Sequence, residues 1–164
     1  MAKPTTDFKG LLHTLLEGGV DFIIVGGLAC NVHGSARVTF DVDVVYARTA
    51  HNIERLVAAL AAHGPYLRGA PPGLPFRFDS QTVHSGLNFT LTTALGDLDL
   101  LGEVTGGGSY AQLLGDTVDL DLFGFRCRCI TLAKLIELKR AAGRVKDLEV
   151  IAELEAIAEE RGPA

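Results

Sequence analysis

Two segments of the chain alternate acidic and aliphatic residues, and this alternation restricts the fold more than any other feature of the sequence. Residues 37–46 (RVTFDVDVVY) place Asp41 and Asp43 two positions apart, and residues 97–104 (DLDLLGEV) repeat the same pattern. A period of two residues is typical of a β-strand with one apolar and one polar face. We therefore predict two strands, each of which carries a pair of carboxylates on one face.

Carboxylates in this arrangement need a positive charge nearby. Side chains at positions i and i+2 of a strand lie roughly 6.5–7 Å apart along the chain, so two carboxylates repel each other. A divalent cation removes the repulsion, and Mg²⁺ or Mn²⁺ typically binds one or two carboxylates together with phosphate oxygens. If the two strands are neighbours, Asp97 or Asp99 adds a third carboxylate to Asp41 and Asp43. Three carboxylates can hold two metal ions for a displacement at phosphorus.

A glycine-rich turn precedes the first acidic strand. Residues 20–25 (VDFIIV) form an apolar, β-branched run that predicts a buried strand, and Gly26 and Gly27 end it. Glycines before a short helical segment let backbone amides approach a phosphate. Ser35 and Arg37 follow within reach in sequence and offer a hydroxyl group and a fixed positive charge.

The rest of the sequence predicts helices around a mixed set of strands. Helices are expected at 7–18, 28–35, 49–63, 109–114, 131–141 and 144–161, strands at 76–80, 87–93, 117–124 and 126–130, and a loop at 64–75. This order indicates an α+β (α/β) fold, a mixed β-sheet flanked by helices and followed by a C-terminal helical pair. We expect one domain over residues 1–164, with its core at about 20–130 and the C-terminal helices at 131–161.

Composition excludes several classes of protein. No apolar run approaches the roughly 18 residues of a membrane helix, and the first ten residues lack an apolar signal core, so we expect a cytoplasmic protein without membrane contact. Cys30, Cys127 and Cys129 are too few and too poorly spaced for a zinc site, and we expect buried thiols. The net charge of −5 does not favour non-specific binding to nucleic acid.

The order of these features resembles a known signature. Residues 26–43 read G-G-x5-H-G-x2-R-x-T-x-D-x-D, which is similar to the minimal nucleotidyltransferases of the DNA polymerase β-like superfamily. The resemblance implies a nucleotidyltransferase-like fold, a phosphate-binding turn at Gly26 and Gly27, and metal ligation by Asp41 and Asp43. It also implies that Asp99, rather than Asp97, is the third catalytic carboxylate. The second turn position is glycine where the family often has serine.

The C-terminal segment extends this resemblance. Residues 131–140 (TLAKLIELKR) and 143–147 (GRVKD) are similar to the "L-x-x-K-R…R-x-K-D" ending of AbiE-type toxins and related uncharacterised nucleotidyltransferase-like proteins. The resemblance implies that Lys139, Arg144 and Lys146 approach the phosphates of a bound nucleotide. From the residues alone, local charge pairing within and between two helices is an equally good interpretation.

Together the resemblances imply a metal-dependent nucleotidyltransferase. Such an enzyme would use Mg²⁺ or Mn²⁺ and transfer a nucleoside monophosphate from a nucleoside triphosphate to a hydroxyl group of RNA, a protein or a small molecule. It would act alone, as a homo-oligomer, or as a toxin paired with an antitoxin. Two alternatives stay open: a non-catalytic nucleotide-binding or protein-interaction module with the same fold, and a hydrolase that uses the same metal cluster on phosphoesters.

Overall fold

A seven-stranded mixed sheet forms the centre of the molecule. The computed structural model describes residues 5–162, and its main sheet has the strand order β3-β4-β5-β2-β1-β9-β8. The strands are β1 (Phe22–Val25), β2 (Asp41–Tyr46), β3 (Tyr66–Leu67), β4 (Phe89–Thr93), β5 (Gly96–Leu101), β8 (Thr117–Leu122) and β9 (Phe125–Ile130). Two short strands, β6 (Glu103–Val104) and β7 (Gly108–Ser109), pair separately. The mixed sheet confirms the predicted α+β fold class.

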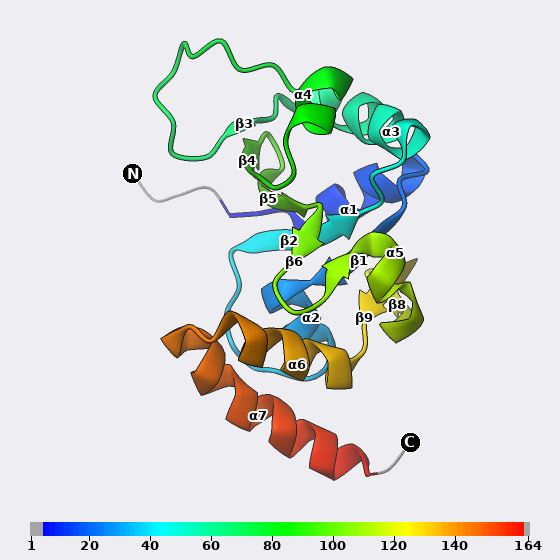
Figure 1. Cartoon of the computed structure of the whole chain (residues 1–164), viewed down its shortest axis with the longest axis vertical. Helices are drawn as coiled ribbons and strands as arrows, with labels where there is room; N and C mark the ends of the chain where they lie inside the picture. The colour runs from blue at the N-terminus through cyan, green and yellow to red at the C-terminus, as the bar shows by residue number, and fades with distance from the viewer. Residues whose placement is uncertain (1–4, 163–164) are drawn as a thin grey trace.

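Helices flank this sheet at both ends of the molecule. They are α1 (Phe8–Glu17), α2 (Gly26–Val32), α3 (Ala50–Leu60), α4 (Ser80–Ser85), α5 (Tyr110–Leu113), α6 (Leu132–Ala142) and α7 (Val145–Arg161), with 3-10 turns at Ala61–His63 and Leu114–Asp116. Figure 1 shows α6 and α7 at one end, near α2, and α3 and α4 at the opposite end. Among the described residues, no helix combines the length and apolarity needed to cross a bilayer.

Several helices begin at the capping residues that the sequence supplies. Asp7, Thr49 and Thr131 each accept a hydrogen bond from a backbone amide in the first turn of α1, α3 and α6. Such a side chain satisfies one of the amides that lack a partner within the helix. At the other end of α6, Gly143 adopts a left-handed conformation with φ of 64°, which separates α6 from α7. The predicted C-terminal helical pair is therefore present.

The register of the central strands brings the two acidic segments together. Strand β2 pairs in parallel with β5, and Asp43 is the register partner of Asp99. On its other side β2 pairs antiparallel with β1, where Val25 faces Asp43. Since residues two apart on a strand project from the same face, the carboxylates of β2 and β5 meet on one face of the sheet.

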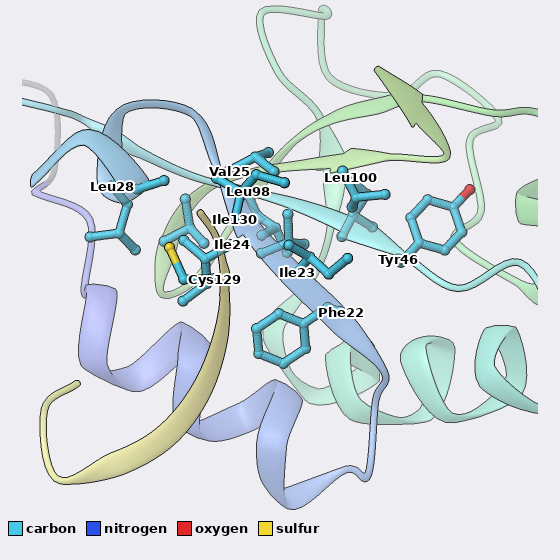
Figure 2. Packing of buried hydrophobic residues seen from close by; sticks show 14 of the residues in the cluster. Phe22, Ile23, Ile24, Val25, Leu28, Tyr46, Leu98, Leu100, Cys129 and Ile130 are labelled. Atoms are coloured by element: carbon cyan, nitrogen blue, oxygen red, sulfur yellow. The ribbon is translucent and has the colours of Figure 1, made fainter. Parts of the chain in front are cut away.

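The apolar residues of the same strands form the core. Figure 2 shows Ile23 and Ile24 of β1 packed among Leu98 and Leu100 of β5 and Cys129 of β9, all fully buried. Cys30 and Cys127 are also buried free thiols, as predicted. Burial is the main reason that the pKa of Cys129 rises to about 12, so this thiol stays protonated at neutral pH.

Four local predictions are wrong. The strand predicted at 97–104 is interrupted at Gly102, since β5 ends at Leu101 and residues 103–104 form β6 in the separate two-stranded sheet. The strand predicted at 37–46 begins only at Asp41, and Val38 and Phe40 are 78% and 71% exposed, because none of the strands within residues 5–162 pairs with residues 37–40. Residues 76–80 do not form a strand, since the Asp79 side chain caps α4 at the end of this segment. The loop predicted at 64–75 contains β3, which pairs with β4.

Candidate functional site

Three carboxylates converge where β2 lies beside β5. Asp41, Asp43 and Asp99 each offer an oxygen atom, and these oxygens all lie within 4.8 Å of one another. The side chains of Asp41 and Asp99 are 30% and 22% exposed, so the group lies at the surface of a cleft rather than in the core. The parallel register accounts for this convergence, because it places Asp43 directly beside Asp99.

The surroundings of Asp43 disfavour its negative charge. Burial raises its pKa to about 8, and the neighbouring carboxylates Asp41 and Asp99 contribute in the same direction. Burial and the proximity of Asp99 also raise the pKa of Asp41. One oxygen of Asp43, Oδ1, is buried and has no hydrogen-bond partner among the described residues. A buried carboxylate oxygen without a partner costs free energy unless a proton or a cation compensates it.

The glycine turn packs directly against this carboxylate. Gly26 has a φ of 66°, a conformation that glycine adopts without strain, and a Cβ atom there would overlap the Asp43 carboxylate. A Cβ atom at Gly27 would overlap the side chain of Thr39. Only glycines at both positions therefore let the start of α2 approach β2 this closely.

Arg68 directly follows β3, and its guanidinium group lies close to three carboxylates. Its Nη2 lies 2.8 Å from Oδ1 of Asp99, its Nε 3.4 Å from Asp97 and its Nη1 3.7 Å from Asp41. Arg68 lies in a segment predicted to be a loop, so no sequence pattern indicated its place at the carboxylates. Asp97, which the resemblance ranked below Asp99, is 5% exposed and belongs to this arginine contact rather than to the group of three converging oxygens.

Cations from the C-terminal helices face the carboxylates. Asp147, at the start of α7, is 1% exposed and accepts hydrogen bonds from Nε, Nη2 and the backbone amide of Arg144. Lys139 of α6 lies with its Nζ 3.4 Å from Asp147 Oδ1. Burial by itself would raise the pKa of Asp147, but the hydrogen bonds and charges of Arg144 and Lys139 outweigh it and lower the pKa. Asp147 therefore positions both cations.

Two clefts meet at the carboxylates. One, of about 470 Å³, contains all three of them and the bases Arg37, Arg68, Lys139, Arg144 and Lys146. The other, of about 450 Å³, shares Asp43 and Asp99 and continues past Gly26 towards Glu103. Gly27 lines the first cleft. A site with five cations around a carboxylate cluster can accommodate a polyanion together with a metal ion.

Ser35 is the one residue predicted for nucleotide binding that the structure does not bring to either cleft. It is 7% exposed, and its hydroxyl donates a hydrogen bond to Glu153 of α7. The same hydroxyl accepts a hydrogen bond from the Arg37 amide, so it shapes the segment that leads to the first cleft. No functional role was predicted for Asp147, although it is the last residue of the R-x-K-D pattern in which Arg144 and Lys146 were predicted to bind phosphate.

The donor set at the three aspartates fits a divalent cation. The ligand atoms are hard carboxylate oxygens, and one of them, Asp43 Oδ1, is buried without a hydrogen-bond partner among residues 5–162. Mg²⁺ and Mn²⁺ prefer such oxygens over nitrogen or sulfur. Cys127 and Cys129 line neither cleft, whereas Cys30, also a buried free thiol, lines the first cleft.

Comparison with known proteins identifies the fold. A solved structure from Thermotoga maritima, described as a "putative nucleotidyltransferase", superposes with a TM-score of 0.54 and 11% sequence identity over 91% of this chain and 94% of that chain. No family model matches the sequence, and no curated protein matches it. The chain therefore has a nucleotidyltransferase-like fold, and at 11% identity the comparison extends no further than the fold.

Proposed function

We propose that the protein is a metal-dependent nucleotidyltransferase that transfers a nucleoside monophosphate from a nucleoside triphosphate to an acceptor hydroxyl group. The observation that carries the proposal is the convergence of Asp41, Asp43 and Asp99 within 4.8 Å in a cleft that basic side chains also line. Carboxylates alone would repel a triphosphate. Cations alone would not explain a buried carboxylate oxygen that has no hydrogen-bond partner within residues 5–162. The two together fit a nucleotide bound with a divalent cation.

The three aspartates would provide the metal site and the general base. Asp41, Asp43 and Asp99 would hold Mg²⁺ or Mn²⁺, and Asp99 would also accept the proton of the acceptor hydroxyl. When bound, the cation would neutralise the leaving pyrophosphate and make the acceptor hydroxyl more acidic.

Basic side chains and the glycine turn would bind the phosphates of the nucleoside triphosphate. Arg37, Lys139, Arg144 and Lys146 would bind their oxygens, and the backbone at Gly26 and Gly27 would close against them. Ser35 would act indirectly, because its hydroxyl holds the backbone that precedes Arg37.

The test is transfer of label from α-³²P-labelled nucleoside triphosphates in the presence of Mg²⁺ or Mn²⁺. Asp43→Asn should abolish transfer, since an amide oxygen is a weaker ligand and carries no charge. Asp121→Asn is a matched control, because Asp121 lies on β8 with a 78% exposed side chain and lines neither cleft. Equal activity of the two variants would refute the metal assignment.

The acceptor and the partner need separate assays. Incubation with short RNA, with protein and with small hydroxyl compounds would show which class receives the label. The similarity of residues 131–147 to AbiE-type toxins extends the proposal to a toxin paired with an antitoxin, which co-purification with the product of a neighbouring gene would test. Nucleotide binding by calorimetry without any labelled product would favour the alternative, a non-catalytic nucleotide-binding module.

A further inference from the structure

Arg68 is held where a cation of the carboxylate cluster would lie. Its backbone amide donates a hydrogen bond to the carbonyl of Thr90, and its Nη2 donates a second hydrogen bond to the carbonyl of Leu91, 2.7 Å away. Both acceptors belong to β4, the strand next to β5. The first contact fixes the backbone at Arg68, and the second holds the guanidinium group at β4, beside the aspartates of β5.

The guanidinium group neutralises only part of the cluster. It forms ion pairs with Asp41, Asp97 and Asp99 at 3.7, 3.4 and 2.8 Å, and its side chain is 22% exposed. It forms no ion pair with Asp43, whose Oδ1 has no hydrogen-bond partner among the described residues. Arg68 therefore compensates only part of the negative charge. The charge of Lys139 acts on Asp43 in the compensating direction, but its effect is smaller than those of burial and of the neighbouring carboxylates.

Arg68 and a metal ion compete for the same oxygen. Oδ1 of Asp99 is one of the buried atoms without a well-aligned hydrogen bond, although the Arg68 nitrogen lies only 2.8 Å away. A cation bound by Asp43 and Asp99 would lie within a few ångströms of the guanidinium group, where two positive charges repel strongly. Arg68 also lines the cleft that holds the other bases, so phosphate oxygens would be within reach after a small rotation.

We propose that Arg68 is a displaceable internal counter-ion, which holds the carboxylates in the metal-free protein and moves to the nucleotide phosphates when a divalent cation takes its place. The inference rests on the proposed function, because it assumes that Asp41, Asp43 and Asp99 bind metal. The segment that follows Arg68 can permit this movement. Residues 68–79 form the extended loop at the top of Figure 1, between β3 and α4.

Loss of Arg68 should strengthen the binding of the metal ion and weaken the binding of the nucleotide, and these opposite changes make the proposal testable. Without nucleotide, Arg68→Gln removes a competitor, so Mn²⁺ alone should bind about tenfold more tightly, as expected for loss of one charge-assisted contact. With a non-hydrolysable nucleoside triphosphate and Mn²⁺, the same variant should bind the nucleotide about tenfold more weakly, because a phosphate contact is lost. A residue with only a structural role would not shift the two affinities in opposite directions.

Isothermal titration calorimetry on the full chain measures both affinities. Arg77→Gln is the matched control, since it removes an exposed positive charge from the same loop, and both of its affinities should equal those of the wild type. Arg68→Lys keeps the charge but loses the planar fork, so we expect a gain in Mn²⁺ affinity of about threefold. This second variant also tests the proposal if Arg68→Gln fails to fold, as judged by circular dichroism.

The possible results separate this inference from the proposed function. If the wild type and Arg68→Gln bind Mn²⁺ equally well while Asp43→Asn does not bind it, Arg68 is not a competitor and only this inference fails. If none of these proteins binds Mn²⁺, the metal site itself is wrong and both proposals fail. Weaker binding of Mn²⁺ by Arg68→Gln, or unchanged nucleotide affinity, would also overturn the inference.

Discussion

The metal-free protein should become more stable when Asp43 is replaced by asparagine at alkaline pH. Asp43 is buried beside Asp41 and Asp99, and these surroundings raise its pKa from the ordinary 3.8 to about 8. Above pH 8 the folded protein therefore contains a buried negative charge without a partner for its Oδ1 among the described residues. Asparagine has nearly the same shape and no charge, so Asp43→Asn removes the unfavourable charge and little else.

The pKa shift gives the sign and the magnitude of the effect. Because the folded pKa is raised, Asp43 is protonated in both states below pH 3.8, and stability is lost as the pH rises from there through about 8. At 1.36 kcal/mol per pH unit, the full shift corresponds to about 6 kcal/mol. Solvent reaches the partly exposed Asp41 and Asp99 and screens the repulsion, so we expect a gain of at least about 2 kcal/mol at pH 9.

Thermal unfolding in EDTA, followed by circular dichroism from pH 5 to pH 9, measures this gain. For a chain of this size, 2 kcal/mol corresponds to an increase in Tm of about 4–8 °C. The difference between Asp43→Asn and the wild type should shrink at pH 5, and addition of Mn²⁺ at pH 9 should stabilise the wild type but not the variant. The pKa of Asp41 is raised in the same direction, so the variant keeps part of the pH dependence.

The control is Asp121→Asn, which removes a carboxylate whose side chain is 78% exposed and should leave the Tm unchanged at both pH values. If Asp43→Asn is as stable as the wild type at pH 9 in EDTA, or less stable, the carboxylate is not electrostatically strained. The argument for a cation at this position would then lose its energetic basis.

Two further substitutions test the elements around the carboxylates. Gly26→Ala should destabilise the fold by about 2 kcal/mol or more and abolish stabilisation by Mn²⁺, because the new methyl group both strains a left-handed residue and overlaps the Asp43 carboxylate. Gly64→Ala, also at positive φ but with no atom within 4 Å of its Cβ, should show the strain alone and keep the response to Mn²⁺. Asp147→Asn should lower the free energy of unfolding by about 2 kcal/mol at neutral pH, since Arg144 loses a charged acceptor. It should also weaken nucleotide binding, as measured by calorimetry. A variant with wild-type stability and affinity would contradict the positioning role of Asp147.

The carboxylate cluster could be predicted because its spacing is local. Asp41 and Asp43 share a strand face by the period of the strand alone. The period left Asp97 and Asp99 equivalent, and the resemblance to nucleotidyltransferases selected Asp99, which the parallel register places beside Asp43. The helices expected at 7–18, 49–63 and 131–141 likewise begin near the predicted positions, where Asp7, Thr49 and Thr131 cap them. These features depend on contacts between residues that are close in sequence.

Predictions that depended on a neighbouring strand were less reliable. The alternation at residues 37–40 is as regular as at 41–46, yet only the second segment pairs with β1 and β5. Val38 and Phe40 are therefore exposed, although the same alternation buries Val42 and Val44 completely. A strand pattern needs a partner in space, and the sequence did not show where the partner strands end.

The sequence alone determined the identity of the carboxylates, the glycine turn and the basic C-terminal helices, since strand period and helix signals are set within a few residues. Only the tertiary structure decided which charges meet. Arg68 reaches Asp99 from the start of the loop that follows β3, and Asp147 directs two cations towards a cleft that α6 and the acidic strands share. The physical reason is that electrostatic pairing depends on distance in space, which chain folding fixes between residues that are distant in sequence.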